Sequence, residues 1–456
     1  MKNISNILKK QKEFFDNGYT KDINFRIEAL EKLKYSIKIN ENNIFKALKR
    51  DLNKSEFETF ITEIGIVYNE INIAIKNIKK WSKAKKVRTP ITNFLASSYI
   101  YKEPYGVVLI ISPWNYPFQL IMAPLIGAIS AGNCILLKPS ELAVETEKII
   151  VDIIKNTFND EYISVVTGGV EESKALLKEK FDYIFYTGGI NVGKIVMKAA
   201  AENLTPITLE LGGKSPCIVD KDADIGLAAR RIAWGKFLNA GQTCVAPDYL
   251  IVHKNIKEEF ISLIKKYIIK FFGENSFESE DYPRIINEKH FKRLEAHLEE
   301  GKIVFGGKRD INNLYIEPTI IEGINFKNRI MQEEIFGPIL PIIEFEYINE
   351  VIDMVKNNSK PLALYYFSED REKQRFVIEN IQFGGGCIND TIMHLATSTL
   401  PFGGVGNSGI GSYHGIASFE TFSRKKSILK KSNLIDIKIR YAPFKGKLEL
   451  ARKIFK

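Results

Sequence analysis

The sequence predicts an α/β protein with two parallel-sheet α/β domains and a small β-hairpin region. From Gly106 onward, apolar runs that suit buried strands alternate with helical stretches, which is typical of parallel sheets with crossover helices. The alternation continues after Glu210, as though a second α/β domain began there. A chain of 456 residues is also too long for one ordinary core, so two or three domains are expected.

The segment before this alternation has a different character. Residues 22–80 contain no proline and only one glycine, Gly65, and their apolar residues recur at helical spacing, which predicts two or three amphipathic helices. Residues 85–103 suggest a short hairpin, a candidate for contact between subunits.

The α/β region yields explicit strand and helix predictions. Strands are expected at 107–111, 135–138, 164–167, 183–187 and 207–210, and then at 249–253, 339–345 and 363–367. A helix is expected at 224–239, with Gly241 at its end. The glycine-rich residues 383–415 are expected to form a functional or interdomain loop.

Charge and composition exclude several classes of protein. The segment 424–456 holds 12 basic and 2 acidic residues and so carries the whole net charge of +10; a folded basic face for nucleic acid is not expected. The charged N-terminus has no apolar core of signal-peptide length, and no stretch reaches the roughly 18 apolar residues of a membrane span. A cytoplasmic protein is therefore expected.

The cysteines and histidines argue against a metal site or a disulfide framework. The four cysteines have no close spacing. His290 and His297 lie seven residues apart on a charged, helix-like stretch and are expected at the surface. No metal is expected.

One cysteine differs from the others. Cys134, Cys217 and Cys387 adjoin apolar runs and suit the usual role of cysteine as a small buried hydrophobe. Cys244 follows turn-forming and polar residues and is a candidate nucleophile. Glu210 ends an apolar run and precedes two glycines, so it could later deprotonate the water that releases an acyl group.

Two glycine strings resemble nucleotide-binding motifs. The string from Gly404 to Gly409 satisfies G-x-G-x-x-G, but it follows no strand and opens no helix, so it is rejected. Gly188-Gly189-Ile190-Asn191-Val192-Gly193-Lys194 follows a strand and opens a helix. Ile195 stands where a P-loop needs Ser or Thr, so this site suits a dinucleotide pyrophosphate better than ATP. Lys138-Pro139-Ser140-Glu141 closes another strand, where a ligand contact and a solvated loop are equally plausible.

Seven motifs, in order, resemble those of the aldehyde dehydrogenase superfamily, most closely its class 3 (fatty and aromatic aldehyde) branch. They are Pro113-Trp114-Asn115-Tyr116-Pro117, Lys138-Pro139-Ser140-Glu141, Tyr186-Thr187-Gly188-Gly189, Glu210-Leu211-Gly212-Gly213-Lys214, Gly241-Gln242-Thr243-Cys244, Glu333-Glu334-Ile335-Phe336-Gly337-Pro338 and Pro401-Phe402-Gly403-Gly404. The short N-terminal region and Gly406-Asn407-Ser408-Gly409 with Tyr413-His414 point to class 3.

This resemblance implies a role for each site residue. Cys244 would be the nucleophile, Glu210 the general base, and Asn115 the oxyanion donor beside the main-chain N–H of Cys244. The implied cofactor contacts are Lys138 and Glu141 at the adenosine ribose, Gly188 and Gly189 near the pyrophosphate, Glu334 and Phe336 at the nicotinamide ribose, and Trp114 and Leu211 in the same site. Trp114, Tyr116 and His394 are candidates for the lining of the aldehyde tunnel.

The resemblance also implies a domain division. Residues 1–83 and 104–210 would form an NAD(P)-binding domain, to which 395–419 return, and 211–394 a catalytic domain. Residues 84–103 and 420–431 would be oligomerisation strands that join a homodimer, and 432–456 a basic tail.

The expected reaction is oxidation of a hydrophobic aldehyde to a carboxylic acid through a cysteine thiohemiacetal and thioester. Glu141 favours NAD, because it could accept a hydrogen bond from a ribose 2′-hydroxyl, although use of NADP as well is credible. Two alternatives stay open: a cofactor-independent thiol esterase or acyl-transfer enzyme, and a dehydrogenase for a short polar semialdehyde.

The basic tail has two interpretations. A helix at its end would place Leu448, Ala451, Ile454 and Phe455 on one face with basic residues around it, which suits weak contact with an anionic membrane surface. A solvated tail that covers a groove between subunits is equally plausible.

Overall fold

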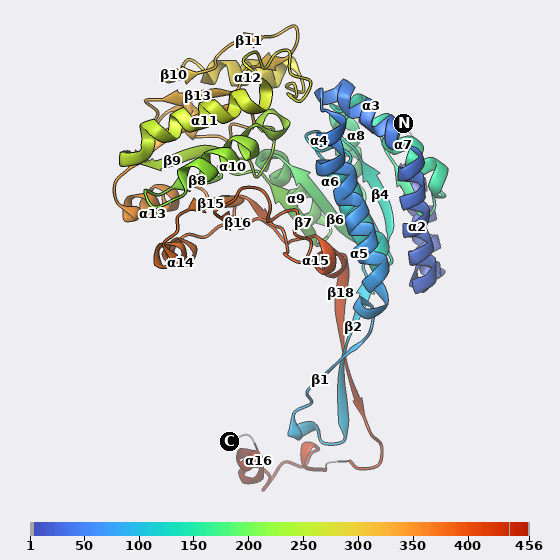
Figure 1. Cartoon of the computed structure of the whole chain (residues 1–456). Helices are drawn as coiled ribbons and strands as arrows, with labels where there is room; N and C mark the ends of the chain where they lie inside the picture. Colours follow the sequence, from blue (N-terminus) through green and yellow to red (C-terminus); the bar gives the residue numbers. More distant parts are fainter. Residues whose placement is uncertain (1–3, 437, 455–456) are drawn as a thin grey trace.

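The computed structural model of the chain describes residues 4–436 and 438–454. It has two α/β lobes and a long β-stranded arm that extends away from both (Figure 1). The predicted α/β class with two largely parallel sheets is confirmed.

The first lobe is built on a six-stranded sheet in the order β17-β7-β6-β3-β4-β5. Its strands are β3 (Val107–Ile111), β4 (Cys134–Lys138), β5 (Ile163–Val165), β6 (Tyr183–Gly188), β7 (Ile207–Leu211) and β17 (Gly409–Ile410). Strands β3 to β7 are parallel, and β17 is antiparallel to β7. All five strands predicted here are present, with ends that differ by at most two residues. Every residue of β4 is buried, as a parallel strand covered on both faces requires.

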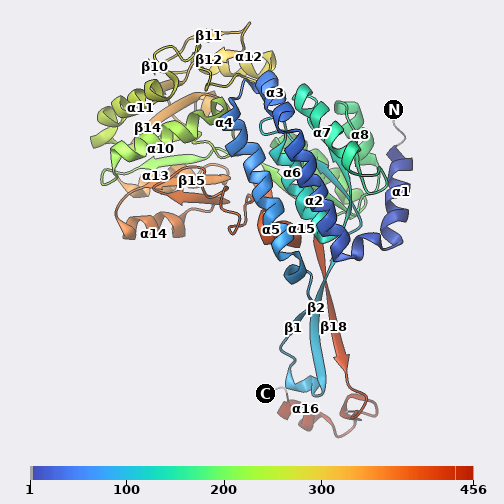
Figure 2. The ribbon, with the colours of Figure 1, turned by 45° about the vertical axis from the view of Figure 1, so that its right-hand side comes forward.

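Helices cover both faces of this sheet (Figure 2). They are α1 (Ile4–Asp16), α2 (Ile23–Ile39), α3 (Glu41–Leu52), α4 (Glu56–Thr59), α5 (Gly65–Trp81), α6 (Gln119–Ala131), α7 (Val144–Thr157), α8 (Val170–Lys178) and α9 (Ile190–Glu202). A five-residue π-helix, Phe60–Ile64, joins α4 to α5. Residues 22–80 therefore contain four α-helices where two or three were predicted, because the short α4 and the π-helix interrupt the regular pattern.

The second lobe contains a seven-stranded sheet in the order β10-β13-β14-β9-β8-β15-β16. Its strands are β8 (Pro216–Val219), β9 (Tyr249–His253), β10 (Lys302–Phe305), β13 (Thr319–Glu322), β14 (Ile339–Phe345), β15 (Ala363–Phe367) and β16 (Gly385–Ile388). Its helices are α10 (Ile225–Phe237), α11 (Lys257–Phe272), α12 (Glu288–His297), α13 (Ile348–Lys356) and α14 (Arg371–Asn380). Only β10 is antiparallel to its neighbour.

The prediction of a loop at residues 383–415 was wrong in part, because this segment contributes the strands β16 and β17. Glycine has a low strand propensity, so these strands could not be predicted from the sequence. Close packing of the backbone nevertheless requires glycine at these positions. A Cβ at Gly386 would lie 2.0 Å from the Leu364 carbonyl oxygen, and one at Gly409 would lie 2.5 Å from that of Leu209.

The arm consists of β1 (Lys85–Val87), β2 (Ala96–Pro104) and β18 (Ser423–Lys431), all antiparallel. Strand β18 returns from α15 (Gly415–Thr421), and the C-terminal segment with α16 (Leu448–Ile454) lies at the far end of the arm (Figures 1 and 2). Phe455, part of the predicted apolar face, is outside the described residues. Within 4–436 and 438–454, no helix combines the length and apolar character needed to cross a bilayer.

Candidate active site

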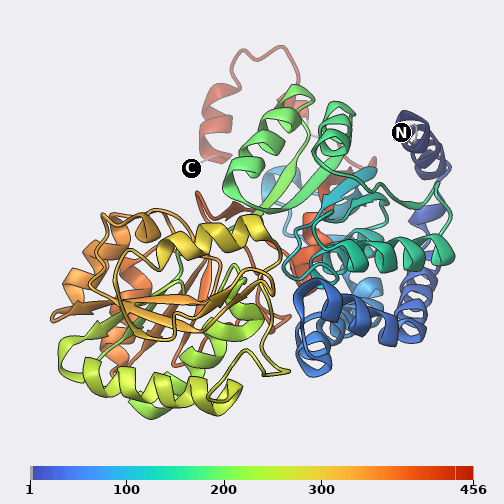
Figure 3. The same ribbon diagram turned by 90° about the horizontal axis from the view of Figure 1, so that it is seen from above.

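A cavity of about 980 Å³ is lined by residues of both lobes. Figure 3 shows the two lobes side by side from above. Residues of the first lobe enter it just after a strand ends: Trp114 and Asn115 after β3, and Gly189 after β6, with Glu210 and Leu211 at the end of β7. Residues of the second lobe enter it just before a strand begins: Lys214 before β8, Cys244 before β9, and Glu334 and Phe336 before β14. The carboxyl edge of one sheet thus meets the amino edge of the other.

The position of the cavity follows from strand order. Strands β3 and β6 are neighbours, but the chain leaves β3 toward β4 on one side and reaches β7 from β6 on the other. Loops at such a switch point diverge and leave a crevice at the carboxyl ends of the strands. Asn115, on the loop after β3, and Gly188, the last residue of β6, lie at this crevice.

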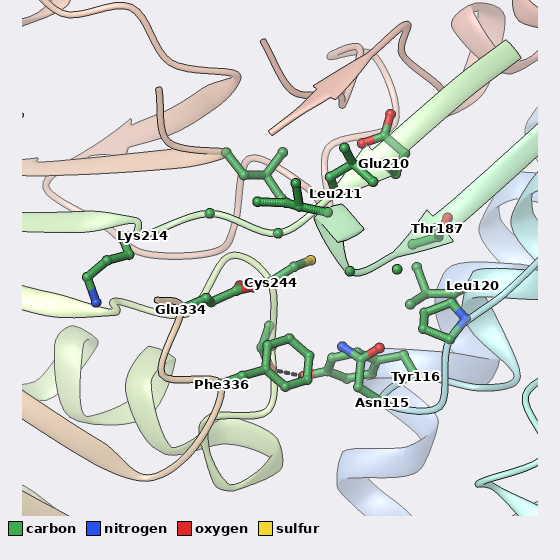
Figure 4. A pocket seen from close by; sticks show the side chains of 18 of the residues that line it. Asn115, Tyr116, Leu120, Thr187, Glu210, Leu211, Lys214, Cys244, Glu334 and Phe336 are labelled. Atoms are coloured by element: carbon green, nitrogen blue, oxygen red, sulfur yellow. Dashed lines mark hydrogen bonds between the residues drawn. The ribbon is translucent and has the colours of Figure 1, made fainter. Parts of the chain in front are cut away.

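Cys244 is presented by a tight turn. Asn239, Ala240 and Gly241 all have positive φ angles (52°, 51° and 73°), and a Cβ at Gly241 would lie 2.3 Å from the Gly337 carbonyl oxygen. In the view of Figure 4 the sulfur of Cys244 lies at the centre of the cavity, with Asn115 on one side and Leu211 on the other.

The thiol of Cys244 is poorly ionised in this environment. Burial raises its pKa to about 12, and the nearby carboxyl groups of Glu334 and Glu210 add to the effect. The main-chain N–H groups of Cys244 and Val245 act in the opposite direction, because they stabilise the thiolate.

Glu210 is buried, and neither of its carboxyl oxygens has a hydrogen-bond partner among the described residues. Burial raises the pKa of this group well above its ordinary value, so its neutral form is favoured. In Figure 4 its carboxyl group is turned away from the Cys244 sulfur. An unpartnered carboxyl group beside a cavity can rotate, and it can accept a proton from water once it has given up its own.

Asn115 connects the two lobes. Its side-chain Nδ2 donates a hydrogen bond to the main-chain oxygen of Gln242 at 3.0 Å. Its own main-chain oxygen accepts hydrogen bonds from Lys54 Nζ at 3.1 Å and from Asn239 Nδ2 at 2.8 Å. Because an amide group has two N–H bonds, one remains for a ligand.

Glu334 and Phe336 form one wall of the cavity. A Cβ at Gly212 would lie 1.9 Å from Glu334 Oε2, so any larger residue there would displace the Glu334 carboxyl group. Burial, with a contribution from Asp248, raises the pKa of Glu334 to about 8. The ring of Phe336 meets that of Trp114 edge-on, with centroids 5.4 Å apart.

The prediction that His290 and His297 lie at the surface was wrong. His290 lines the cavity against Trp114, and its buried Nδ1 has no hydrogen-bond partner among the described residues. Burial lowers its pKa to about 4. His297 is fully buried, and its Nδ1 lies 2.7 Å from Glu300 Oε1. Both histidines lie on the face of α12 that packs inward, although the stretch as a whole is charged.

The beginning of α9 suits a phosphate group. The first N–H groups of a helix have no partner within it, and Gly188, Gly189, Ile190 and Val192 all line the cavity. A Cβ at Gly189 would meet nothing within 4 Å, so there is open space beside this helix terminus.

Three residues named from the sequence do not line the cavity. Lys138 ends β4 and Glu141 follows it at the same edge of the sheet, and they form an ion pair of 3.1 Å in which the side chain of Glu141 is 40% exposed. His394 is also absent from the lining, and its Nδ1 lies 3.5 Å from the sulfur of Cys387.

Sequence reasoning missed most of the apolar lining. These residues are Ile61, Ile66, Leu120, Trp234, Leu238, Ile392, Leu395 and Phe402. Ile61 and Ile66 belong to the π-helix and α5, and Trp234 to α10, where each matches an ordinary apolar position in a helical pattern. No local signal separates such residues from core.

A cavity that presents a thiol, a neutral carboxyl group and an amide donor is typical of enzymes that form a covalent bond between sulfur and a carbonyl carbon. The model of the aldehyde dehydrogenase family matches residues 2–428, and this chain belongs to that family. It is an oxidoreductase that acts on the aldehyde group.

Relatives resemble the chain over nearly its whole length. A 4,4′-diaponeurosporen-aldehyde dehydrogenase from Staphylococcus aureus is 51% identical over 447 residues, which cover 98% of this chain and 97% of that protein. A dimeric NADP-preferring aldehyde dehydrogenase from Rattus norvegicus is 45% identical over 450 residues, covering 98% and 99%.

Solved structures of aldehyde dehydrogenases also resemble this chain. The substrate-bound AldH of Staphylococcus aureus matches with a TM-score of 0.98 at 50% identity and covers 100% of both chains. Betaine aldehyde dehydrogenase from Staphylococcus aureus in complex with NAD+ matches with a TM-score of 0.85 at 28% identity and covers 96% of this chain and 88% of that one.

Proposed function

We propose that this aldehyde dehydrogenase oxidises hydrophobic aldehydes, of medium or long chain or aromatic, to carboxylic acids. The observation that carries this proposal is the apolar lining of the cavity that holds Cys244, to which Ile66, Leu120, Trp234 and Phe402 contribute. Such walls favour an alkyl or aromatic group over a short polar one. The relative named for 4,4′-diaponeurosporen-aldehyde supports the same class.

In the proposed mechanism, the thiolate of Cys244 attacks the aldehyde carbon and forms a thiohemiacetal. The free N–H of the Asn115 amide and the main-chain N–H of Cys244 stabilise the oxyanion. Loss of a hydride leaves a thioester on the sulfur. The carboxylate of Glu210 then accepts a proton from water, which attacks the thioester and releases the acid.

A nicotinamide cofactor, NAD or NADP, supplies the hydride acceptor when it is bound. The open space at Gly189 and the unpaired N–H groups that begin α9 suit its pyrophosphate. We assign Glu334, Phe336, Trp114 and Leu211 to the nicotinamide end, and Lys138 and Glu141 to the adenosine ribose. Because its carboxylate would accept a hydrogen bond from a 2′-hydroxyl and repel a 2′-phosphate, Glu141 favours NAD, which is expected to give the higher kcat/KM.

The test measures formation of NADH with straight-chain aldehydes from short to long and with aromatic aldehydes. We expect kcat/KM to rise with chain length and to vanish in Cys244→Ala. Activity only on a short polar semialdehyde would refute the hydrophobic substrate class and keep the mechanism. Cofactor-independent ester turnover, with no NADH from any aldehyde, would favour the acyl-transfer alternative.

We infer that the arm joins two copies of the chain. It carries exposed apolar side chains, among them Tyr101, Ile428 and Leu429, that a partner could cover. In the corresponding division, residues 1–83, 104–210 and 395–419 bind the cofactor, 211–394 carry the nucleophile, and 84–103 and 420–431 form the arm. Sedimentation analysis should give a dimer, and Tyr101→Glu/Leu429→Glu should give monomers.

The tail could also contact a membrane surface. Leu434, Phe444, Leu448 and Leu450 are exposed at the far end of the arm, among basic residues. Cosedimentation with anionic vesicles should then depend on residues 432–456. Equal binding after their deletion would refute the membrane interpretation and leave the tail as a cover for a groove between subunits.

A further inference from the structure

A fully buried ion pair lies directly beneath the loop that carries Asn115. Lys54 follows α3, Glu63 lies in the π-helix, and Lys54 Nζ is 2.7 Å from Glu63 Oε1 with both side chains 0% exposed. Two well-packed apolar side chains of similar volume would often be as stable as a buried ion pair. Stability therefore does not by itself explain these charges.

The remaining hydrogen bonds of the pair go to the Asn115 loop. Lys54 Nζ donates to the Asn115 main-chain oxygen at 3.1 Å and lies 3.9 Å from the centre of the Tyr116 ring. Glu63 Oε2 accepts hydrogen bonds from the main-chain N–H groups of Phe118 and Gln119 at 2.9 and 3.1 Å. The pair thus holds the loop at its middle and at its end, and its carboxylate also meets the N-terminus of α6, where an anion is favoured.

The same segment reaches the turn that precedes Cys244. Glu58 Oε1 accepts a hydrogen bond from the main-chain N–H of Asn239 at 2.9 Å. Asn239 Nδ2 in turn donates to the same Asn115 oxygen that Lys54 contacts, at 2.8 Å. The Asn115 carbonyl therefore receives one hydrogen bond from the segment between α3 and α4 and one from the turn beside the nucleophile.

We propose that Lys54 and Glu63 are positioning residues, whose buried ion pair fixes the main chain of Asn115 so that its side-chain N–H points at the carbonyl oxygen of a substrate on Cys244. This inference rests on the proposed function, in which Asn115 is the oxyanion donor. A displacement of about 1 Å in such a donor can lower the rate by about 100-fold. A donor that acts only in the transition state affects kcat with little change in KM.

The test is a mutant cycle. Lys54→Met/Glu63→Gln removes both charges together, so that neither is left buried alone, and it is combined with Asn115→Ala. We expect the pair variant to lower kcat about 10- to 100-fold, with the KM for aldehyde changed less than about threefold. On the Asn115→Ala background it should lower kcat further by less than about threefold, because the group it positions is already gone.

A matched control separates positioning from loss of stability. Asp51 lies on α3 and accepts hydrogen bonds from the main-chain N–H groups of Glu145 and Thr146 at 3.0 and 2.8 Å, so it ties the same helix to α7 and not to the Asn115 loop. Asp51→Asn should lower Tm and leave kcat unchanged. If Lys54→Met/Glu63→Gln does not fold, Lys54→Gln/Glu63→Gln takes its place, because it also removes both charges and keeps a polar group at each position.

The outcomes are distinguishable. If Asn115→Ala lowers kcat and the folded pair variant keeps wild-type kcat, the positioning role is overturned and the oxyanion role stands. If the pair variant lowers kcat equally in both backgrounds, it acts independently of Asn115 and the proposal is wrong. If Asn115→Ala itself leaves kcat unchanged, the failure lies in the proposed function.

Discussion

The side-chain nitrogen of Asn115 lies 3.0 Å from the main-chain oxygen of Gln242, and this hydrogen bond joins the loop after β3 to the turn before Cys244. The two residues belong to different lobes. The bond therefore fixes the position of the Asn115 side-chain amide relative to Cys244.

Asn115→Ala should lower kcat by about 100- to 1000-fold and change KM little, because one oxyanion donor contributes most strongly in the transition state. Steady-state kinetics at saturating cofactor measure the effect, and Tm checks folding. A kcat within about threefold of wild type would exclude Asn115 as the donor.

Alkylation of Cys244 should be slow at neutral pH. Because burial and the carboxyl groups of Glu334 and Glu210 raise the thiol pKa to about 12, the thiolate fraction in the protein without cofactor is far below that of a free cysteine. The rate with iodoacetamide, followed by peptide mass spectrometry, should rise about tenfold per pH unit from pH 7 to 10 without a plateau. Glu334→Gln should speed alkylation, and a plateau below pH 9 in the wild type would contradict this account.

Glu58→Gln should change the pH dependence of stability. Burial raises the pKa of Glu58 from 4.5 to about 7, so the folded state holds a proton that the unfolded state loses at lower pH. Stability from this group is complete below about pH 4.5 and is lost as pH rises through 7. Such a pKa difference corresponds to about 3 kcal/mol.

Since Gln does not titrate and can still accept the Asn239 N–H, the Tm of Glu58→Gln relative to wild type should rise between pH 5 and pH 8. Differential scanning calorimetry at the two values measures this shift. An equal Tm difference at both values would show that Glu58 titrates normally.

Gly189→Ala should weaken cofactor binding without affecting folding. A Cβ there would meet nothing within 4 Å, but it would enter the space assigned to the pyrophosphate. Calorimetric titration with NAD+ should show Kd raised at least about tenfold, at unchanged Tm. Gly226→Ala, in the first turn of α10 and outside the cavity, is the matched control and should bind NAD+ like wild type. An unchanged affinity for NAD+ in Gly189→Ala would show that the pyrophosphate does not bind beside Gly189.

Much of the fold could be predicted from local sequence patterns. The strands β3, β9, β14 and β15 match their predicted bounds without error, because each is a mostly apolar run in a parallel sheet. The short strands β16 and β17 were not predicted, since their glycines carry no β signal and are required only by close backbone packing. The wrong surface prediction for His290 and His297 also came from local sequence. Their charged neighbours lie on the outer face of α12, whereas the two histidines lie on its inner face.

Local sequence was enough to predict the α/β class, the order of the strands along the chain, the family motifs and the candidacy of Cys244, Glu210 and Asn115, because these depend on residues close together in the chain. The folded structure was needed to show that Lys54 and Glu63 contact the loop of Asn115, that Ile66 and Trp234 line the cavity, and that burial favours the neutral form of Glu210. Those properties come from contacts between segments far apart in sequence and from the exclusion of water, and neither leaves a local pattern.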